Sequence, residues 1–433
     1  MPQDPITDGL LKEVIAGRIS QTIKTGLGVA VSGGGDSVAL MVLLSDIATE
    51  KGFDLRVVTV DHGLRPASAQ EARQVASIAA TLGLGHDVLT WGGWGGKGNL
   101  QDAARRARYD LMAKWARSRG LDHVALGHTA EDQAETVLMR LARASGVDGL
   151  SGMGDKRRYR GVTFLRPMLR LRRDDLRAFL SRRGVDWIDD PSNDDIAFDR
   201  VRLRKAMPAL NALGLTVPRL TSVARNMRDV RDTLDWYAYV EARAAVRIDN
   251  GDVVIPLRDI RRLRDEILRR ILIRSLAWIS GAEYAPRARA TALMIETIKN
   301  GASMTLNGCI ATVNDGALRL SREPNAVSGQ IAGSDETWDG RWKISPAPIA
   351  NQTGQHMVKP YPAGAEIRAL GQDGLAQCPD WRDTGLPRQS LLASPALWHG
   401  DELIAAPLAG RSNGWSAHLI KDDEVFFTAF LTH

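Results

Sequence analysis

A short glycine turn between an apolar strand and an apolar helix limits the folds open to this chain more than any other segment does. Residues 32–37 read Ser-Gly-Gly-Gly-Asp-Ser, after the apolar run 27–31 and before the apolar stretch 38–44. Consecutive glycines allow positive φ angles and let a ligand approach the backbone where a Cβ would clash. The helix N-terminus that follows favours an anion through its free N–H groups and its dipole. The segment therefore predicts a phosphate-binding turn in an α/β fold.

The polar side chains of the turn indicate how a phosphate would be held. Ser32 and Ser37 add hydroxyl donors. Asp36 is unexpected, because a carboxylate among phosphates is repelled unless a cation lies between them, so we expect it to hold Mg²⁺ or to guard a leaving pyrophosphate. The turn is not a Walker loop, since no Gly-Lys-Ser/Thr follows, and it does not match Gly-x-Gly-x-x-Gly. A turn that only connects strand and helix is the alternative.

Periodicity predicts the organisation of the chain. Strand and helix patterns alternate from about 27 to 200, which is typical of a doubly wound parallel sheet with ligands at the carboxyl ends of its strands. Helical periodicity then dominates, before turns at Asn307-Gly308 and Asn314-Asp315-Gly316 predict hairpins. We expect an α/β catalytic domain over 1–215, a helical domain ending in a β-hairpin over 216–325, and a small mixed α/β C-terminal domain over 326–433. Residues 424–430 read as a strand.

Composition narrows the class of protein. A chain of 433 residues with 44% hydrophobic residues can bury two or three cores. No apolar run approaches the roughly 20 residues of a membrane span, and no secretory signal is evident. Cys309 and Cys378 lie far apart, which indicates neither a disulfide framework nor a metal cluster. These features predict a cytoplasmic protein without a membrane segment.

The net charge of +6 is concentrated in clusters. Residues 156–183 hold eleven Lys or Arg and two acids, and further clusters contain Arg200, Arg202 and Arg204, and the arginines of 258–274. Such clusters attract a phosphate backbone. Solvated helix faces are the alternative.

A second constellation follows the strand predicted over 122–127. His128, Asp132 and Glu135 fall at i, i+4 and i+7 and share one stripe of the next helix. Two carboxylates there could bind an ammonium group, hold Mg²⁺ or act as a base, whereas capping of the first turn is the structural alternative. In the preceding predicted helix, 100–119, Arg105 and Arg108 could stabilise charge on a phosphate, unless they are simply solvated.

The order of these motifs resembles one family. Residues 32–37, Val-Asp-His-Gly-Leu-Arg-Pro (60–66), Ala-Arg-Arg-Ala-Arg-Tyr (104–109), Gly-His-Thr-Ala-Glu-Asp-Gln-Ala-Glu-Thr (127–136), Gly-Val-Asp-Gly-Leu-Ser-Gly-Met (146–153) and Asp-Asp-Pro-Ser-Asn (189–193) occur in sequence. Together they are similar to the tRNA(Ile)-lysidine synthetases of the PP-loop (N-type ATP pyrophosphatase, adenine nucleotide alpha hydrolase-like) superfamily. The chain departs from the family pattern at Gln101 and Val201.

The resemblance implies a reaction and its residues. The family adenylates the carbon-2 oxygen of the wobble cytidine in a CAU-anticodon isoleucine tRNA, releases pyrophosphate, and lets the amine of free lysine displace AMP, which changes codon reading from AUG to AUA. It implies ATP and Mg²⁺ at the phosphate turn, catalytic roles for Asp36, Arg108 and His128, and lysine at Asp132 and Glu135. The implied ATP-binding residues are Ser32, Gly33, Gly34, Gly35, Asp36 and Ser37, and the implied tRNA-binding residues are Arg200, Arg202 and Arg204. The oligomeric state stays open, a homodimer included.

Two rival functions predict sequence features that can be compared with this chain. A tRNA thiolase of the same superfamily needs a cysteine nucleophile or cluster ligands in the catalytic half, and both cysteines here lie beyond residue 300. A catalytically inactive tRNA-binding protein predicts loss of Asp36 or of the 128–135 stripe, and both are intact.

Overall fold

The structure is a computed structural model that describes residues 6–19, 23, 26–61, 63, 68–94, 96, 100–188, 199–282, 284–347, 349–350, 356–357 and 361–431. The chain divides into two compact units, 1–231 and 232–432. Helix α9 (Val217–Ala245) continues from the first unit into the second. The predicted boundary at 325/326 falls inside the second unit, so the division into three domains stays a prediction.

The first unit is built on a sheet whose strand order is β3-β2-β1-β4-β6-β5. The strands are β1 (Gly26–Ala30), β2 (Asp54–Asp61), β3 (Gly85–Thr90), β4 (His123–Leu126), β5 (Lys156–Tyr159) and β6 (Val162–Leu165). All neighbouring pairs are parallel except β5 and β6, which are antiparallel. The predicted α/β class with a doubly wound parallel sheet is therefore confirmed, with one antiparallel strand at the edge.

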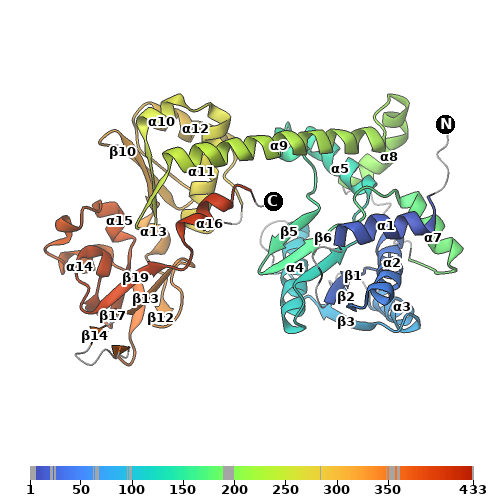
Figure 1. Cartoon of the computed structure of the whole chain (residues 1–433), viewed down its shortest axis with the longest axis horizontal. Helices are drawn as coiled ribbons and strands as arrows, with labels where there is room; N and C mark the ends of the chain where they lie inside the picture. Colours follow the sequence, from blue (N-terminus) through green and yellow to red (C-terminus); the bar gives the residue numbers. More distant parts are fainter. Residues whose placement is uncertain are drawn as a thin grey trace. The chain divides into compact units, whose positions relative to one another are not determined.

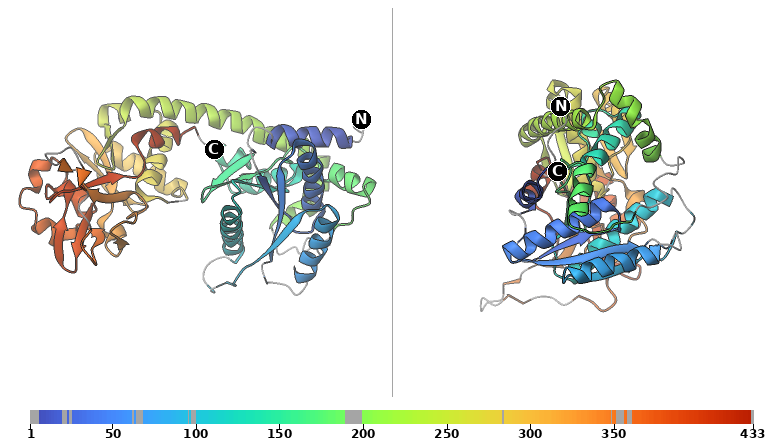
Figure 2. Two further views of the ribbon diagram at one scale, coloured as in Figure 1. Left: turned by 60° about the horizontal axis from the view of Figure 1, so that its bottom comes forward. Right: turned by 90° about the vertical axis from the view of Figure 1, so that its right-hand side faces the viewer.

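Helices cover both faces of this sheet (Figure 1, Figure 2). The face towards α1 (Asp8–Ile19), α2 (Gly35–Lys51), α3 (Ser68–Thr81) and α7 (Arg173–Arg182) buries one apolar cluster, and the face towards α4 (Leu100–Ser118) buries another. Alternation along a strand divides the two clusters: Val57 packs into the first and Val58 into the second. Gly28 lets α4 approach β1, because a Cβ there would lie 2.7 Å from Trp115.

A helical group extends from the carboxyl end of β4. It contains α5 (Ala130–Leu141), α6 (Val147–Leu150), α8 (Asp199–Ala212) and the start of α9. Small and aliphatic side chains of α5, among them Ala134 and Val137, pack against Val217 and Leu220 of α9 and half-buried residues of α8. This packing holds α8 beside α5.

The second unit contains an antiparallel sheet of order β7-β8-β11-β10-β9 and the helices α10 (Leu257–Arg262), α11 (Asp265–Ser280) and α12 (Ala288–Lys299). Its strands are β7 (Arg247–Asp249), β8 (Asp252–Pro256), β9 (Met304–Leu306), β10 (Cys309–Asn314) and β11 (Ala317–Arg322). The predicted hairpin turns are confirmed, since Asn307 and Asp315 both take positive φ angles before glycines.

The C-terminal part of the second unit is mixed, as predicted. A sheet of order β12-β16-β17-β18 is accompanied by the strand pairs β13–β19 and β14–β15. The strands are β12 (Ala332–Gly333), β13 (Trp342–Pro346), β14 (Ile349–Ala350), β15 (His356–Met357), β16 (Glu366–Ala369), β17 (Pro395–His399), β18 (Glu402–Ala405) and β19 (Trp415–Leu419). The helices are α13 (Pro324–Val327), α14 (Gly371–Ala376), α15 (Arg388–Leu392) and α16 (Asp423–Thr428), with 3-10 turns at Trp381–Thr384 and Pro407–Ala409.

One local prediction for this unit was wrong and another was incomplete. The strand predicted over 424–430 is instead helix α16 (Asp423–Thr428) and the turn after it, because Asp422 caps the helix N-terminus and Phe426 and Phe430, four residues apart, reach the same core. The stretch after 220 also contains β7 and β8, whose short strands interrupt the helical pattern. In the part of the chain that the structure describes, no helix is long and apolar enough to span a membrane.

Candidate active site

The phosphate turn lies between β1 and α2, as predicted, and its two serines close it. The Ser32 backbone N–H donates to Ser37 Oγ at 3.1 Å, and Ser37 Oγ donates to the Gly34 carbonyl at 2.8 Å. Gly33 has a φ of 92°, and a Cβ there would lie 2.6 Å from Ile188 Cδ1. Only glycine fits this position, so the backbone of the turn is fixed for close approach to a ligand.

Gly127 brings the end of β4 against the same turn. A Cβ at Gly127 would lie 3.0 Å from the Ser37 Cα atom. This close contact places the phosphate turn of β1 beside the residues that follow β4, since the two strands are neighbours in the sheet. This role of Gly127 was not predicted from the motif 127–136.

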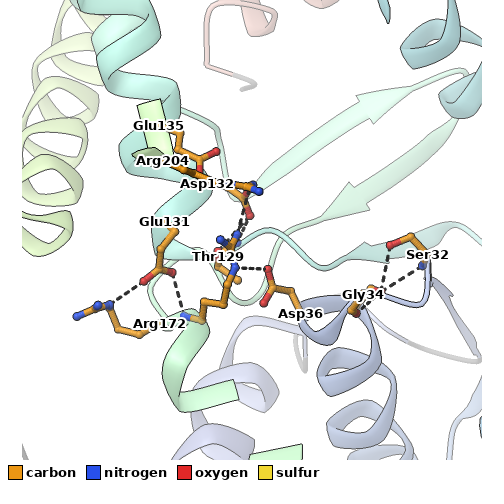
Figure 3. Close-up of polar contacts among 11 residues, drawn as sticks. Ser32, Gly34, Asp36, Thr129, Glu131, Asp132, Glu135, Arg172 and Arg204 are labelled. Atoms are coloured by element: carbon orange, nitrogen blue, oxygen red, sulfur yellow. Dashed lines mark hydrogen bonds and ion pairs between the residues drawn. The ribbon is translucent and has the colours of Figure 1, made fainter. Parts of the chain in front are cut away.

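Asp36 leads from the turn to a second group of acids (Figure 3). Its Oδ2 atom accepts a hydrogen bond from Arg173 Nε at 2.9 Å, and Arg173 Nη2 lies 3.8 Å from Asp132 Oδ1. The Asp36 Oδ1 atom is buried and has no hydrogen-bond partner among the described residues. Burial raises the pKa of Asp36, although Arg173 opposes that shift. Arg173 was not predicted as a site residue; it lay unremarked within the basic cluster 156–183.

The acids of α5 form the second acidic group, and the structural alternative of capping is observed for Asp132. Asp132 Oδ2 accepts from the backbone N–H and the hydroxyl of Thr129, at 2.9 and 3.1 Å, and so closes a capping box at the helix N-terminus. Its Oδ1 atom faces the arginines of the site. Glu131, which was not predicted as a site residue, accepts from Arg172 Nε at 2.7 Å.

Glu135 is the most enclosed acid of the stripe, with 2% of its surface exposed. Its Oε1 atom accepts from Arg204 Nε at 2.6 Å, whereas Oε2 is buried without a partner among the described residues. Burial raises the pKa of Glu135, and the ion pair with Arg204 opposes the shift. Glu135 therefore combines a free acceptor atom with an elevated pKa, which suits binding of an ammonium group and acceptance of its proton.

The three arginines predicted to bind tRNA occupy different environments. Arg202 is exposed and pairs with Asp199 on the surface of α8. Arg204 instead lies among the acids, 4.0 Å from Asp132 Oδ1. Arg200 is half-buried and contributes to the positive potential at His128. Of these three arginines, Arg202 is the exposed one.

His128 directly precedes Thr129, the N-cap residue of α5, so it lies outside the predicted helical stripe, and the charge of Arg108 acts on it. Burial lowers the pKa of His128 to about 3, and the guanidiniums of Arg166 and Arg108 add to the lowering while Asp132 opposes it. The imidazole is therefore neutral near pH 7. Nδ1 of His128 and Nε of Arg108 are both buried without partners among the described residues. A neutral imidazole beside a guanidinium can orient a base and stabilise a developing anion, but it cannot supply a proton as an acid.

The motif 60–66 lies partly, and the motif 189–193 wholly, outside the described residues. Of the segment 60–66, Asp61 Oδ1 accepts from the Gly63 backbone N–H at 2.8 Å. The segment 189–193 is not among the described residues.

Several arginines of the basic cluster 156–183 form ion pairs with acids of the first unit. Arg182 pairs with Asp8, and Arg183 pairs with Asp46. Together with Arg172 and Arg173, these side chains form ion pairs with acids of α1, α2 and α5, although Arg182 and Arg183 are exposed.

The comparisons with known proteins fit this geometry. Residues 11–210 match a family model described as the PP-loop domain, which contains the phosphate turn and the α5 acids. The first unit is thus that of a PP-loop ATPase.

Over 407 residues the chain is 47% identical to a tRNA(Ile)-lysidine synthase of Ruegeria pomeroyi, covering 94% of each chain. It is 38% identical over 315 residues to that of Methylobacterium nodulans, covering 70% of this chain and 92% of the relative. The chain belongs to the tRNA(Ile)-lysidine synthase family. It is accordingly a ligase that uses ATP and modifies isoleucine tRNA, and neither rival function is supported.

Proposed function

We propose that the phosphate turn and the α5 acids form one site that adenylates the wobble cytidine of a CAU-anticodon isoleucine tRNA and then joins free lysine to it. The connection Asp36–Arg173–Asp132 carries this proposal, because one guanidinium reaches both the turn and the acids. The two half-reactions would therefore proceed within a side chain's length of each other, without transfer of the intermediate between sites.

In the first half-reaction the turn holds the triphosphate, and the carbon-2 oxygen of cytidine attacks the α-phosphorus. The bond to the β-phosphate oxygen breaks, and pyrophosphate leaves. Arg108 stabilises the negative charge that builds on the α-phosphate. His128 is neutral and therefore adds no charge to the site. Its buried Nδ1 atom would orient the cytosine base.

The donor set of the turn fits Mg²⁺. Mg²⁺ usually takes one or two carboxylates and completes its shell with water and substrate phosphates. Asp36 offers one such carboxylate, and its buried Oδ1 atom has no partner among the described residues. Asp36 would hold the ion, which when bound neutralises phosphate charge.

In the second half-reaction the ε-amine of lysine attacks carbon 2, the bond from carbon 2 to the adenylated oxygen breaks, and AMP leaves with that oxygen. Asp132 and Glu135 would bind the incoming ammonium. Glu135 would take a proton from the nitrogen, because its raised pKa makes it the more basic carboxylate. The cytoplasmic site of action and a homodimer stay predictions.

A pair of arginines on α8 tests the division between the lysine and tRNA sites. Arg204→Ala removes the ion pair that opposes the rise in the pKa of Glu135 caused by burial, so the protonated form of Glu135 is favoured, and we expect the KM for lysine to rise about tenfold while the Kd for tRNA changes less than about twofold. Arg202→Ala should do the reverse, weakening tRNA binding and lowering the salt slope by about 1. Steady-state kinetics and filter binding measure both; the assignment is wrong if Arg204→Ala acts mainly on tRNA affinity.

A further inference from the structure

Four guanidiniums surround a single buried tyrosine beside the candidate active site. Tyr109 is 1% exposed. The guanidinium carbons of Arg157, Arg105 and Arg108 lie 4.6, 5.6 and 5.9 Å from the centre of its ring. Arg166 completes the group by donating from Nη2 to the Tyr109 hydroxyl at 3.2 Å. We call Tyr109 and these four arginines the Tyr109 cluster.

Separate segments of the fold build this cluster. Arg105 and Arg108 lie one turn apart in α4, Arg157 belongs to β5, and Arg166 directly follows β6. The Tyr109 ring is fixed edge-on to Phe164, with 4.8 Å between ring centres. Because α4 connects two parallel strands, it runs opposite to them, and its first half lies at their carboxyl ends. The cluster is therefore on the ligand-binding edge of the sheet, near β4 and β6.

The charges of Arg105, Arg108 and Arg166 are not balanced by acids among the described residues. Within the described ranges no carboxylate lies at ion-pair distance from Arg105 or Arg108, and the printed partners of Arg166 are the neutral Tyr109 hydroxyl and Gly154 carbonyl. The buried Nε atoms of Arg108 and Arg166 lack acceptors there. Burial lowers the pKa of Arg108, and the neighbouring arginines lower it further. Elsewhere in the unit comparable arginines, such as Arg173, have carboxylate partners. Such a cluster is stabilised when an anion binds.

We propose that the Tyr109 cluster binds a phosphodiester of the tRNA strand next to the modified cytidine. The inference rests on the proposed function. Phosphate groups are the chemistry that converging guanidiniums recognise, and both tRNA and ATP carry them. The tRNA is favoured by position, because the ATP phosphates are expected at the turn after β1 whereas the cluster lies by β4 and β6. Arg105 is exposed and open to a large ligand.

The role of the cluster is to position the nucleotide. A phosphate held there would fix the backbone beside His128, whose imidazole feels the charges of Arg166 and Arg108. Arg105 and Arg157 would bind the phosphate, Arg166 would hold Tyr109 in place, and Arg108 would remain directed at the reacting groups. Phosphate contacts of this kind fix register without reading sequence.

Arg105→Gln and Arg157→Gln test the proposal, with Arg106→Gln as a matched control. Arg106 is the next residue of α4, is exposed, and pairs with Asp102 outside the cluster. Filter binding of CAU-anticodon tRNA over a salt series measures Kd, and pyrophosphate release at saturating tRNA measures the KM for ATP. We expect each cluster variant to raise Kd about tenfold near 0.1 M salt and to lower the salt slope by about 1, with the KM for ATP within about twofold. Arg106→Gln should behave as wild type, and Arg105→Lys should regain most of the slope.

Two results would overturn the proposal. A raised KM for ATP and weaker inhibition by inorganic pyrophosphate, with an unchanged salt slope, would assign the cluster to the triphosphate. Unchanged Kd and KM in both variants would make the cluster structural only. Failure of the proposed function is distinguishable, because it would appear as absence of lysine incorporation by the wild-type chain, independently of any variant.

Discussion

Asp36→Asn is expected to lower kcat/KM for pyrophosphate release by at least about a thousandfold while leaving the Kd for tRNA within about twofold. The substitution preserves shape but removes the carboxylate that offers a buried, unpartnered oxygen beside the phosphate turn. Arg173 then loses its closest carboxylate partner, and Asp132, at 3.8 Å, is its other ion-pair partner among the described residues. The measurement is pyrophosphate release under saturating tRNA and ATP, with tRNA affinity by filter binding.

Asp46→Asn is the control for this variant. Asp46 lies on the same helix and pairs with Arg183 at 2.7 Å, but it is remote from the turn. Loss of an ion pair on α2 alone should therefore leave the rate unchanged. Near wild-type pyrophosphate release by Asp36→Asn would remove Asp36 from the catalytic role assigned to it.

Glu135→Gln is expected to raise the KM for lysine at least about thirtyfold, because a charge pair with a buried carboxylate contributes about 2 kcal/mol or more. The KM for ATP should change less than about twofold. Glu135 is a better test than Asp132, whose second oxygen caps α5, so that its replacement would also destabilise the helix by about 1 kcal/mol. Steady-state kinetics with lysine and ATP varied in turn separate the two effects.

The pH dependence provides a second measurement on the same variant. Glu135 must be deprotonated to bind the ammonium and take its proton, and burial raises its pKa. Activity should therefore fall as pH decreases, starting at a higher pH than an ordinary glutamate would give, and Glu135→Gln should lack this limb. Glu131→Gln, on the same helix and also paired with an arginine, is the control. Equal increases in the KM for lysine in both variants would contradict a lysine pocket at Glu135.

The parts of the site that depend on local pattern were predictable from the sequence. The glycine turn follows a strand and opens a helix, and helical periodicity places Asp132 and Glu135 on one stripe of α5, whereas His128 precedes the N-cap Thr129 and lies outside the predicted stripe. The doubly wound sheet follows equally from the alternation of strands and helices. These features can be predicted because each depends only on residues that are close together in the sequence.

The partners of these residues depend on the order of strands and could not be read from the sequence. Arg173 pairs with Asp36, which lies 137 residues earlier in the sequence, because α7 packs against the sheet. Arg204 pairs with Glu135, which lies 69 residues earlier, because α8 packs against α5. The same packing brings several arginines of the basic cluster 156–183 into ion pairs with acids of the first unit. Helix α16 was misassigned because short apolar runs suit a strand and a helix equally well.

In this account, one site cleaves ATP to AMP and pyrophosphate and attaches lysine to the tRNA. Incubation of the chain with CAU-anticodon isoleucine tRNA, labelled lysine and ATP labelled at the α-phosphate tests it most directly. We expect one lysine incorporated into the tRNA for each AMP released, with no labelled ADP. Labelled ADP as the product, or AMP release without lysine in the tRNA, would contradict the account.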